Sequence, residues 1–341
     1  MSSVTVGIAG ITSRLARLLL ASLLTNCSPV TIRGLCRNKS KLPPSILTHP
    51  QITVIEADAF DLPAVNSFVQ GCDVVVCAYL GLNDLVVDGQ KLLIDACEEA
   101  AVKQYFASDF TLDYNGLESG QHPTKESMKI VKEYLERPGR KMKGVYVLCG
   151  AFMEVLFSPF FGLLGVDEEG SDQVLKYWGS GEEVWEVTTY GSVAEYTAAL
   201  VMDERAVGTF RFLGDRKSTR QIAEEFEVVY GKKPKMECQG SFEELFKLMH
   251  ETFNKDSENW PAYVFMFYHY YCLNSKTHLG SKLNNGTYPA IKPASVKDFL
   301  HSHDMKTLSS LYDTVGLDVL NSFGGQAEER RSIFSHRSVA Y

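Results

Sequence analysis

Side chains that can exchange protons gather near the middle of the chain, in SDFTLDYNGLESGQHPTKESMK, residues 108–129. Asp109 can accept a proton or hold a substrate cation, although an aspartate at this place can also simply cap its loop. Lys125 can act as an acid if its neighbours bring its titration near neutral pH, although a lysine in the first turn of a helix is often merely solvated. These two residues are the candidate catalytic groups.

A glycine-containing segment with different chemistry, VGIAGITS, occupies residues 6–13 between an expected strand and an expected helix. Gly7 would permit a tight turn, and Gly10 would let the backbone approach a pyrophosphate at the start of the helix. Ser13 stands where a third glycine is usual, and its hydroxyl can bond a backbone N–H at the start of the helix or a phosphate oxygen, while Thr12 offers a second hydroxyl. The glycines could also serve only to turn a strand into a helix.

Cations follow the second expected strand, in the segment GLCRNKSK, where no acidic residue is nearby in the sequence. A carboxylate at this position binds the adenosine 2′-hydroxyl of NAD, whereas a cation accommodates the 2′-phosphate of NADP. The segment therefore predicts NADP(H) as the cofactor. Arg37 directly follows the strand, whereas Lys39 and Lys41 could equally belong to a solvated basic turn.

Two histidines are also considered: His122 lies close to Lys125, and His269 lies in a later aromatic run. His122 precedes Pro123 and is expected in a surface turn. His269 lies in VFMFYHYYCL, where a lone histidine among aromatic residues is expected to be packed rather than catalytic.

The elements that must position these residues alternate between short runs rich in Val and Ile and helical segments. Nearly continuous apolar strands separated by helices indicate a parallel sheet that is covered on both faces. Right-handed crossovers then give an α/β fold with a doubly wound, Rossmann-type sheet. We expect strands at 4–9, 30–36, 51–58, 72–79, 103–109 and 144–152.

The chain changes character after Phe152 and becomes rich in aromatic residues. LKYWGSGEEVWEVTTY, residues 175–190, predicts a β-hairpin, and a later helix is expected to end at Gly231. We expect a cofactor-binding core at 1–155, completed by about 186–214, a substrate-binding lobe at 156–185 and 215–320, and a loose tail at 321–341. The lobe predicts a wide apolar pocket for an aromatic or polycyclic small molecule. Its aromatic candidates are Phe157, Phe160, Phe161, Trp178, Trp185, Phe265, Tyr268 and Tyr271.

Composition and charge argue against several classes of protein. The net charge of −8 over 341 residues makes nucleic acid an unexpected partner. The eight cysteines are scattered without the spacing of a metal site, which indicates a reducing, cytoplasmic compartment. Arg14 and Arg17 interrupt the first apolar run, so no secretory leader is expected, and no membrane-spanning segment is expected either. The oligomeric state is left open.

The order of several motifs resembles the NmrA-like and isoflavone-reductase-like branch of the atypical short-chain dehydrogenases, over about residues 4–300. The motifs are VGIAGITSR, GLCRNKSK, ADAFD, YFASDFTLD, GAFME and TTYGSVAEYTAAL. The nearest likeness is to fungal enzymes of secondary metabolism. The resemblance implies a cofactor site formed by Gly7, Gly10, Ile11, Thr12, Ser13, Arg14, Arg37, Lys41, Asp58, Ala59, Phe60, Ala78, Tyr79, Leu80, Ser108, Cys149, Gly150, Ala151 and Phe152.

Reductases that this chain resembles carry a lysine on the helix after the fifth strand, near the nicotinamide ribose. An ungapped alignment of MKIVKEYLE places Met128 at that position. The resemblance therefore implies that the usual proton donor is displaced or absent. Lys125, one helical turn earlier at the edge of the expected buried stripe, is its candidate replacement.

Three functions are compatible with these residues. The first is an NADPH-dependent reductase that delivers hydride to an iminium, enone or carbonyl carbon of an aromatic or alkaloid-like metabolite. The second is an isomerase or cyclase that binds the cofactor and orders a cycloaddition by proximity. The third is a regulator that senses NADP and binds a transcription factor. The missing lysine favours an iminium substrate for the first, since such a substrate needs no strong acid.

Overall fold

The computed structural model describes residues 3–27, 29–81, 83–170 and 172–321, and its largest element is a seven-stranded sheet in the order β11-β6-β5-β4-β1-β2-β3. All neighbouring strands are parallel. The chain moves outward from β1 to β3 and then returns to the other side of β1, so a ligand-binding switch point lies between β1 and β4. The strands are β1 Val4–Ala9, β2 Val30–Cys36, β3 Ile52–Glu56, β4 Val74–Cys77, β5 Gln104–Phe106, β6 Lys143–Leu148 and β11 Gly208–Arg211.

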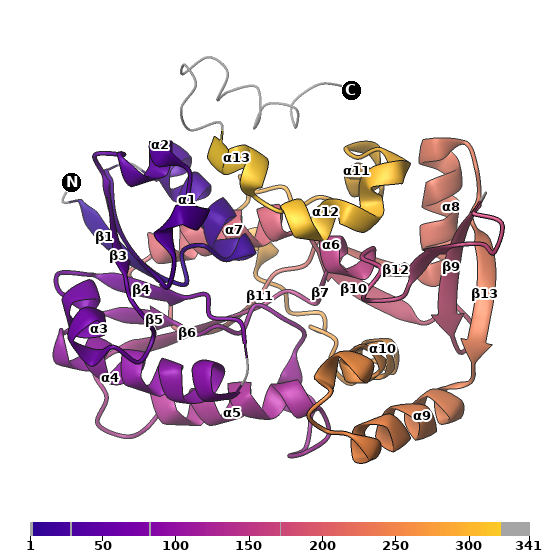
Figure 1. The fold of residues 1–341 in the computed structure, drawn as a ribbon, viewed down its shortest axis with the longest axis horizontal. Coiled ribbons are helices and arrows are strands. Elements are labelled where there is room, and N and C mark those ends of the chain that lie inside the picture. The colour runs from indigo at the N-terminus through magenta and orange to yellow at the C-terminus, as the bar shows by residue number, and fades with distance from the viewer. Residues whose placement is uncertain (1–2, 28, 82, 171, 322–341) are drawn as a thin grey trace.

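Helices cover both faces of this sheet (Figure 1). α1 and α7 pack on one face, and α3, α4 and α5 pack on the other. The Val and Ile side chains of the strands are therefore buried on both sides, which confirms the predicted doubly wound α/β sheet. These helices are α1 Arg14–Asn26, α3 Leu62–Val69, α4 Gln90–Glu99, α5 Pro123–Leu135 and α7 Tyr190–Val201, with the short α2 Pro44–Leu47 after β2 and a π-helical turn, Asp84–Gly89, before α4.

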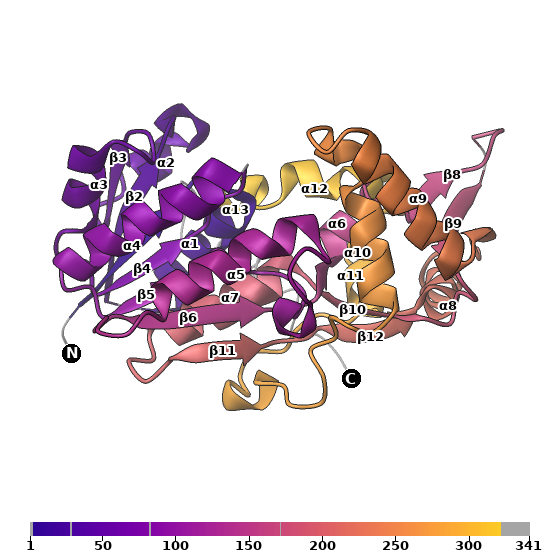
Figure 2. The ribbon, with the colours of Figure 1, turned by 90° about the horizontal axis from the view of Figure 1, so that it is seen from below.

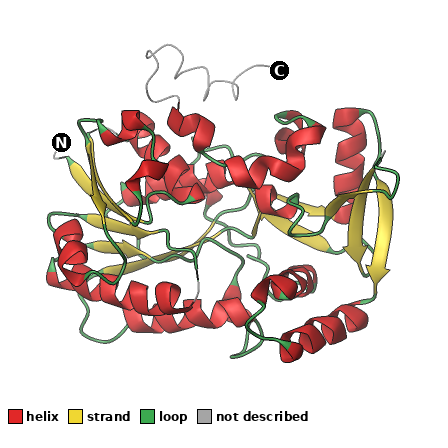
Figure 3. Ribbon diagram, in the orientation of Figure 1, coloured by secondary structure: helices red, strands yellow, loops and turns green. Residues whose placement is uncertain are grey.

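Two smaller three-stranded sheets lie beyond the main sheet, on the right in Figure 3, with the orders β12-β10-β7 and β13-β9-β8. The predicted hairpin at 175–190 is wrong, because β9 and β10 belong to different sheets. Each strand instead pairs with a segment that comes later in the chain, β9 with β13 and β10 with β12. The strands are β7 Ala151–Phe152, β8 Leu164–Val166, β9 Gln173–Trp178, β10 Val184–Thr188, β12 Asp215–Ser218 and β13 Lys235–Gly240.

Most of the remaining helices complete a lobe whose own core is rich in aromatic rings, whereas α13 packs against α1 on the core of the main sheet. α10 lies next to the end of α5 in both views (Figures 1 and 2). Gly231 adopts φ +72° and ends α8 as predicted. Among the described residues, no helix is long and apolar enough to cross a bilayer. The helices are α6 Met153–Leu156, α8 Thr219–Tyr230, α9 Phe242–Lys255, α10 Val264–Leu273, α11 Val296–His301, α12 Leu311–Thr314 and α13 Leu317–Asn321.

The expected tail at 321–341 falls, apart from Asn321 at the end of α13, outside the described residues.

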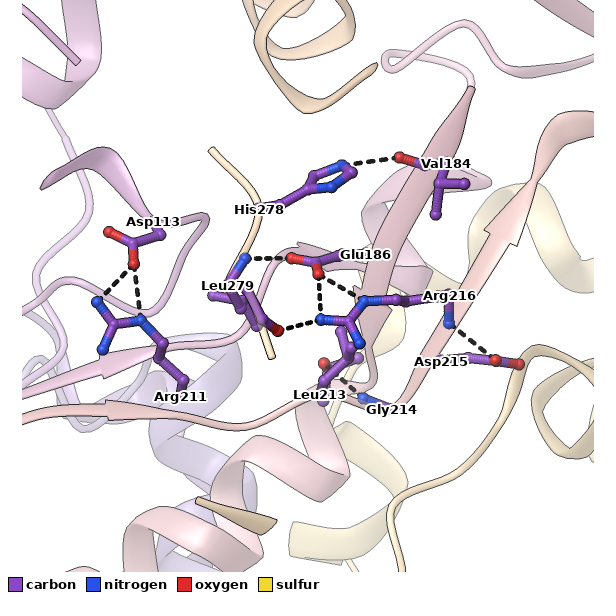
Figure 4. Close-up of polar contacts among 12 residues, drawn as sticks. Asp113, Val184, Glu186, Arg211, Leu213, Gly214, Asp215, Arg216, His278 and Leu279 are labelled. Carbon is purple, nitrogen blue, oxygen red and sulfur yellow. Dashed lines mark hydrogen bonds and ion pairs between the residues drawn. The ribbon is translucent and has the colours of Figure 1, made fainter. Parts of the chain in front are cut away.

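A buried carboxylate joins the lobe to the loop that follows α10 (Figure 4). Glu186 on β10 is 4% exposed and accepts hydrogen bonds from Arg216 Nε and Nη2, at 2.7 and 2.6 Å, and from the N–H of Leu279. On the core side, Arg211 forms an ion pair of 2.7 Å with Asp113. The loop itself meets the core through the Asp113 N–H, which donates to the Thr277 carbonyl at 3.0 Å, and meets the lobe through the contact of Leu279 with Glu186.

We predict that Glu186→Ala lowers the free energy of unfolding by about 2–4 kcal/mol, because it leaves the buried Leu279 N–H without its carboxylate acceptor. Urea unfolding measures the change. The control is Glu182→Ala, since Glu182 forms an exposed ion pair with Arg220 at 3.2 Å and is expected to contribute less than about 1 kcal/mol. Equal effects of the two substitutions would contradict the role given to Glu186.

Candidate functional site

Gly10 shapes the turn between β1 and α1. Its φ is +80°, and a Cβ at this position would lie 2.8 Å from the carbonyl oxygen of Ala78, so the turn requires glycine. The N–H groups of Gly10 and Ile11 both donate to the Leu35 carbonyl, at 2.9 and 3.2 Å. Because these donors are used within the fold, the first turn of α1 supplies the N–H groups that can meet an anion.

Gly7 and Ser13 differ in how well the structure matches their predicted places. The assignment of Gly7 to a turn is wrong, because β1 continues hydrogen bonding through Ala9 and Gly7 lies within the strand. A Cβ at Gly7 would come within 3.1 Å of Phe68 and Cys72, so glycine here allows α3 to pack closely on the sheet. Ser13 is the N-cap of α1 and accepts a hydrogen bond from the Ala16 N–H at 3.4 Å. Thr12, between this cap and Ile11, is half-buried.

Arg14, the first residue of α1, is held by the C-terminal segment of the described chain. Its Nε donates to the carbonyl of Tyr312 at 2.6 Å, and its guanidinium lies 3.7 Å from the centre of the Tyr312 ring. The ring of Tyr312 also stacks with Phe160. Residues more than 150 positions apart in the sequence therefore meet at the N-terminus of α1.

The cations after β2 lie on the surface. Arg37 and Lys41 are exposed, and Lys39 forms an ion pair of 3.6 Å with Glu56. Glu56 ends β3 and is paired in register with Cys36, so the fold brings a carboxylate to a place where the sequence shows none nearby. Lys39 neutralises this carboxylate, and Arg37 has no ion pair among the described residues.

The segments after β3 and β4 form the next part of this edge. Asp58 accepts a hydrogen bond from the Phe60 N–H at 3.0 Å, Ala59 is buried, and the Phe60 ring is 47% exposed. After β4, Ala78 contacts the turn at Gly10, as described above, and Leu80 is 73% exposed. Two apolar side chains are thus held in the open at the carboxyl edge of the sheet.

A buried glutamine ties the ends of β4 and β5 together. Gln90 Oε1 accepts hydrogen bonds from the N–H of Ser108 at 3.1 Å and from the hydroxyl of Tyr105 at 3.3 Å. Ser108 Oγ in turn donates to the carbonyl of Tyr79 at 2.7 Å. The Tyr79 hydroxyl is buried with no hydrogen-bond partner among the described residues. Ser108 is therefore committed to structure, whereas Tyr79 retains an unused polar group.

The end of β6 carries four predicted residues in different surroundings. Cys149 is buried, and burial raises its pKa above the usual value. Gly150 adopts φ +70°, and a Cβ there would lie 2.3 Å from the Glu186 carbonyl oxygen. Ala151 and Phe152 form β7, and the Phe152 ring stacks on Tyr190 with 3.7 Å between ring centres.

Glu154 lies two residues after the end of β7 and is not among the site residues predicted from the sequence. Its two carboxylate oxygens accept hydrogen bonds from the Tyr190 N–H at 3.1 and 3.2 Å, at the start of α7. Burial raises the pKa of Glu154 to about 7. The sequence signal for Glu154 is that it is the one acidic residue in the apolar run GAFMEVLFSPFF. Carboxylates are rarely buried without a partner, so an acid in an apolar run is a candidate for a special role.

Lys125 is almost fully enclosed, with only 1% of its surface exposed, whereas the sequence predicts a place at the edge of the buried stripe. Its Nζ donates to Thr111 Oγ1 and to Tyr268 Oη, both at 2.8 Å, and lies 3.8 Å from Met128 Sδ. No carboxylate of the described residues forms an ion pair with it. Met128, at the position of the family lysine, thus contacts the lysine that lies one turn earlier.

Asp109 is also buried and lies close enough to Lys125 to be influenced by its charge. Burial raises the pKa of Asp109 to about 6, while the hydrogen bond from the Tyr114 hydroxyl and the charge of Lys125 oppose this rise. Its Oδ1 has no partner among the described residues. Tyr114 was not recognised in the sequence, because it belongs to a 3-10 turn, Tyr114–Gly116, that only the fold brings back to Asp109.

The two histidines are both enclosed. The expectation that His122 lies in a surface turn is wrong, because α10 covers it and its ring contacts Tyr268 with 4.8 Å between centres. Burial lowers the pKa of His122 well below its usual value. His269 is packed among aromatic rings as predicted, donates from Nε2 to the Phe161 carbonyl, and has a pKa lowered by burial to about 4.

Comparison with known proteins decides the family. The model of the NmrA-like family matches residues 2–267. This chain belongs to the NmrA-like family. A curated NmrA-like family domain-containing oxidoreductase from Gibberella moniliformis is 28% identical over 144 residues, which are 42% of this chain and 46% of that protein. The alignment thus spans about half the length of this relative.

Solved structures share the fold of this NmrA-like protein. The crystal structure of an isoflavone reductase aligns with a TM-score of 0.72 and 18% identity, over 88% of this chain and 99% of the other. The leucoanthocyanidin reductase–NADPH complex from Vitis vinifera aligns with a TM-score of 0.70 and 15% identity, over 87% and 98%. The likeness to isoflavone-reductase-like folds is thereby confirmed.

A dinucleotide fits the residues of this NmrA-like protein at the switch point. Gly10 has no Cβ to fill the space beside Ala78, and the first turn of α1 presents N–H groups. The exposed Arg37 directly follows β2. These features lie at the ends of adjacent strands β1, β2 and β4. The buried Lys125 lies farther along the same edge, after β5.

We predict that Gly10→Ala destabilises the protein by about 2–4 kcal/mol, because it combines left-handed backbone strain with a clash at Ala78. The control is Gly231→Ala, which has a similar φ of +72° but no atom within 4 Å of its Cβ, and should cost only about 1–2 kcal/mol. Thermal and urea unfolding compare the two variants. A Gly10→Ala variant no less stable than Gly231→Ala would contradict the close approach.

Asp109→Asn should change how stability depends on pH. The pKa of Asp109 rises from an unfolded value of 3.8 to about 6 on folding, so the folded state binds its proton more tightly. Asp109 therefore contributes stability that is fully present below about pH 4 and is lost as the pH rises through about 6. The variant should remove this loss, of roughly 2–3 kcal/mol. Unfolding curves at several pH values test it, and an unchanged pH dependence contradicts the assignment.

Proposed function

We propose that this protein is an NADP(H)-dependent reductase whose substrate is an aromatic or polycyclic small molecule with an iminium, enone or carbonyl carbon. The observation that carries the proposal is the buried, hydrogen-bonded Lys125, which lies after β5 on the same carboxyl edge of the sheet as the Gly10 turn and contacts the aromatic lobe through Tyr268. We assign residues 1–155 and about 186–214 to cofactor binding, and 156–185 and 215–320 to substrate binding.

In this proposal, three segments hold NADP(H). The turn at Gly10 and the first turn of α1 meet the pyrophosphate, and the exposed Arg37 meets the adenosine 2′-phosphate. The open Phe60 ring lies at the end of β3, where it can stack on the adenine. The complex of leucoanthocyanidin reductase with NADPH, which has the same fold, supports this cofactor. When bound, NADPH supplies a hydride.

The substrate class follows from the rings that border the carboxyl edge. Phe152 stacks on Tyr190, and Phe160 contacts Phe265 with 3.6 Å between ring centres. Aromatic faces of this kind bind flat apolar molecules through stacking and burial. The curated relative from Gibberella moniliformis is named an oxidoreductase, which supports a reductase; a role in secondary metabolism with alkaloid-like substrates is our own choice. The eight free cysteines support a reducing, cytoplasmic setting.

Arg37→Ala should weaken NADPH binding about tenfold or more and leave NADH binding nearly unchanged, because only NADPH carries the 2′-phosphate. Fluorescence titration of the reduced cofactors measures both dissociation constants. Arg205→Ala is the matched control, since Arg205 is an exposed arginine paired with Asp203 on the loop after α7. Unchanged NADPH affinity in Arg37→Ala would contradict this phosphate contact.

Turnover is tested by incubating the protein with NADPH and a set of aromatic ketones, enones and iminium ions, while NADPH absorbance and products are followed. We expect NADPH to be consumed in proportion to reduced product. A product formed without loss of NADPH would contradict the reductase and point to redox-neutral cyclase chemistry. Cofactor binding without any product would point to a sensor.

A further inference from the structure

We propose that Tyr268, on α10, is the residue that touches the substrate and gives it a proton, and that Lys125 is the positioning residue beneath it. This inference rests on the proposed reductase function. It assigns the acid to the lobe, 143 residues after the lysine that holds it, rather than to the helix where reductases of the family carry theirs.

The hydrogen-bond geometry of Lys125 leaves it no donor for a substrate. Its ammonium group has three hydrogens, and Nζ already faces three acceptors, Thr111 Oγ1, Tyr268 Oη and Met128 Sδ. With 1% of its surface exposed, the side chain cannot reach a ligand without losing these contacts. Tyr268 is only half-buried as a residue, so part of its side chain remains accessible.

The hydroxyl proton of Tyr268 is free to be donated. Because Lys125 donates to Oη, the oxygen is an acceptor in that bond, and the tyrosine keeps its own hydrogen. The only other partner of the hydroxyl among the described residues is Thr124 Oγ1, at 3.4 Å, which is at the weak end of hydrogen bonding. A substrate oxygen would offer a better acceptor.

The charges around Tyr268 favour its ionised form. Burial alone would raise the pKa of this phenol, but the charge and hydrogen bond of Lys125 lower it overall. The other titratable groups that face it are neutral near pH 7. Burial lowers the pKa of His122, on the loop before α5, well below its usual value. Burial also raises the pKa of Cys272, on α10 itself, to about 12. Asp109 interacts with the charge of Lys125, which opposes the rise in the pKa of that carboxyl.

For a carbonyl substrate, the bound NADPH transfers hydride and becomes NADP⁺, so the carbonyl carbon gains a C–H bond. The O–H bond of Tyr268 breaks as its proton passes to the substrate oxygen, which gives an alcohol and a phenolate. Lys125 stabilises the phenolate through the existing hydrogen bond, and solvent restores the proton after the product leaves. An iminium substrate accepts hydride without any proton, so it does not need Tyr268.

The experiment compares Tyr268→Phe with wild type on two probes, phenanthrenequinone as a carbonyl substrate and N-methyl-dihydroisoquinolinium as an iminium. We expect kcat on the quinone to fall about 100-fold or more, and kcat on the iminium to stay within about threefold. Tyr270→Phe on the same helix is the matched control, because its hydroxyl lies away from Lys125 and its ring contacts Phe242 and Phe246. It should retain both activities.

A second readout uses the protein without cofactor. Ultraviolet titration of tyrosinate should show one tyrosine of the wild type that ionises at lower pH than an ordinary tyrosine. This step should vanish in Tyr268→Phe and move to higher pH in Lys125→Met. Unchanged NADPH affinity and thermal unfolding show that the variants are folded.

The outcomes separate the two proposals. Wild-type quinone turnover by Tyr268→Phe, or a tyrosine titration that the variant leaves unchanged, overturns the role of Tyr268 while the reductase stands. Loss of both activities in Tyr268→Phe with intact NADPH binding shows a binding role and also overturns the proton transfer. If the wild type consumes NADPH with neither probe, the reductase function fails and this role fails with it.

Discussion

The structure depends on one buried cation. An ammonium group removed from water is strongly destabilising unless polar partners replace its hydration, and Lys125 obtains them from a loop after β5 and from α10 of the lobe. Thr111 and Tyr268 can both reach Nζ only when the lobe is seated on the core. The hydrogen bond from the Asp113 N–H to the Thr277 carbonyl and the contact of Glu186 with Leu279 hold the loop after α10, which keeps this seating in place.

The contact between Lys125 and Met128 explains why a methionine fits at position 128. A lysine at that position would place a second cation next to Lys125, whose Nζ lies 3.8 Å from the methionine sulfur. Methionine fills the space with a polarisable, uncharged group. The cation that the structure shows here is Lys125, buried one turn before Met128 on α5, and the polar group that we propose meets the ligand is the Tyr268 hydroxyl from α10.

Local patterns in the sequence predicted what local physics decides. Runs of Val and Ile predicted the parallel strands. Ser13 predicted the start of α1, and Gly231 predicted the end of α8. Errors arose where distant segments decide the outcome. The hairpin at 175–190 failed because β12 and β13 arrive later in the chain, and the burial of His122 and Lys125 depends on α10, more than 130 residues beyond them. The pairing of Lys125 with Tyr268 has no signal in either segment alone.

The central claim is that the cofactor turn and the Lys125–Tyr268 pair form one reaction site. A crystal structure of the complex with NADPH tests it most directly, through the distance from Tyr268 Oη to C4 of the nicotinamide. A carbonyl group placed between them, at reacting distance from C4 and hydrogen-bonded to the phenol, requires about 4–7 Å. The account predicts a distance in that range with an open path between the two atoms. A nicotinamide more than about 10 Å from Tyr268, or one screened from it by the protein, would contradict the account.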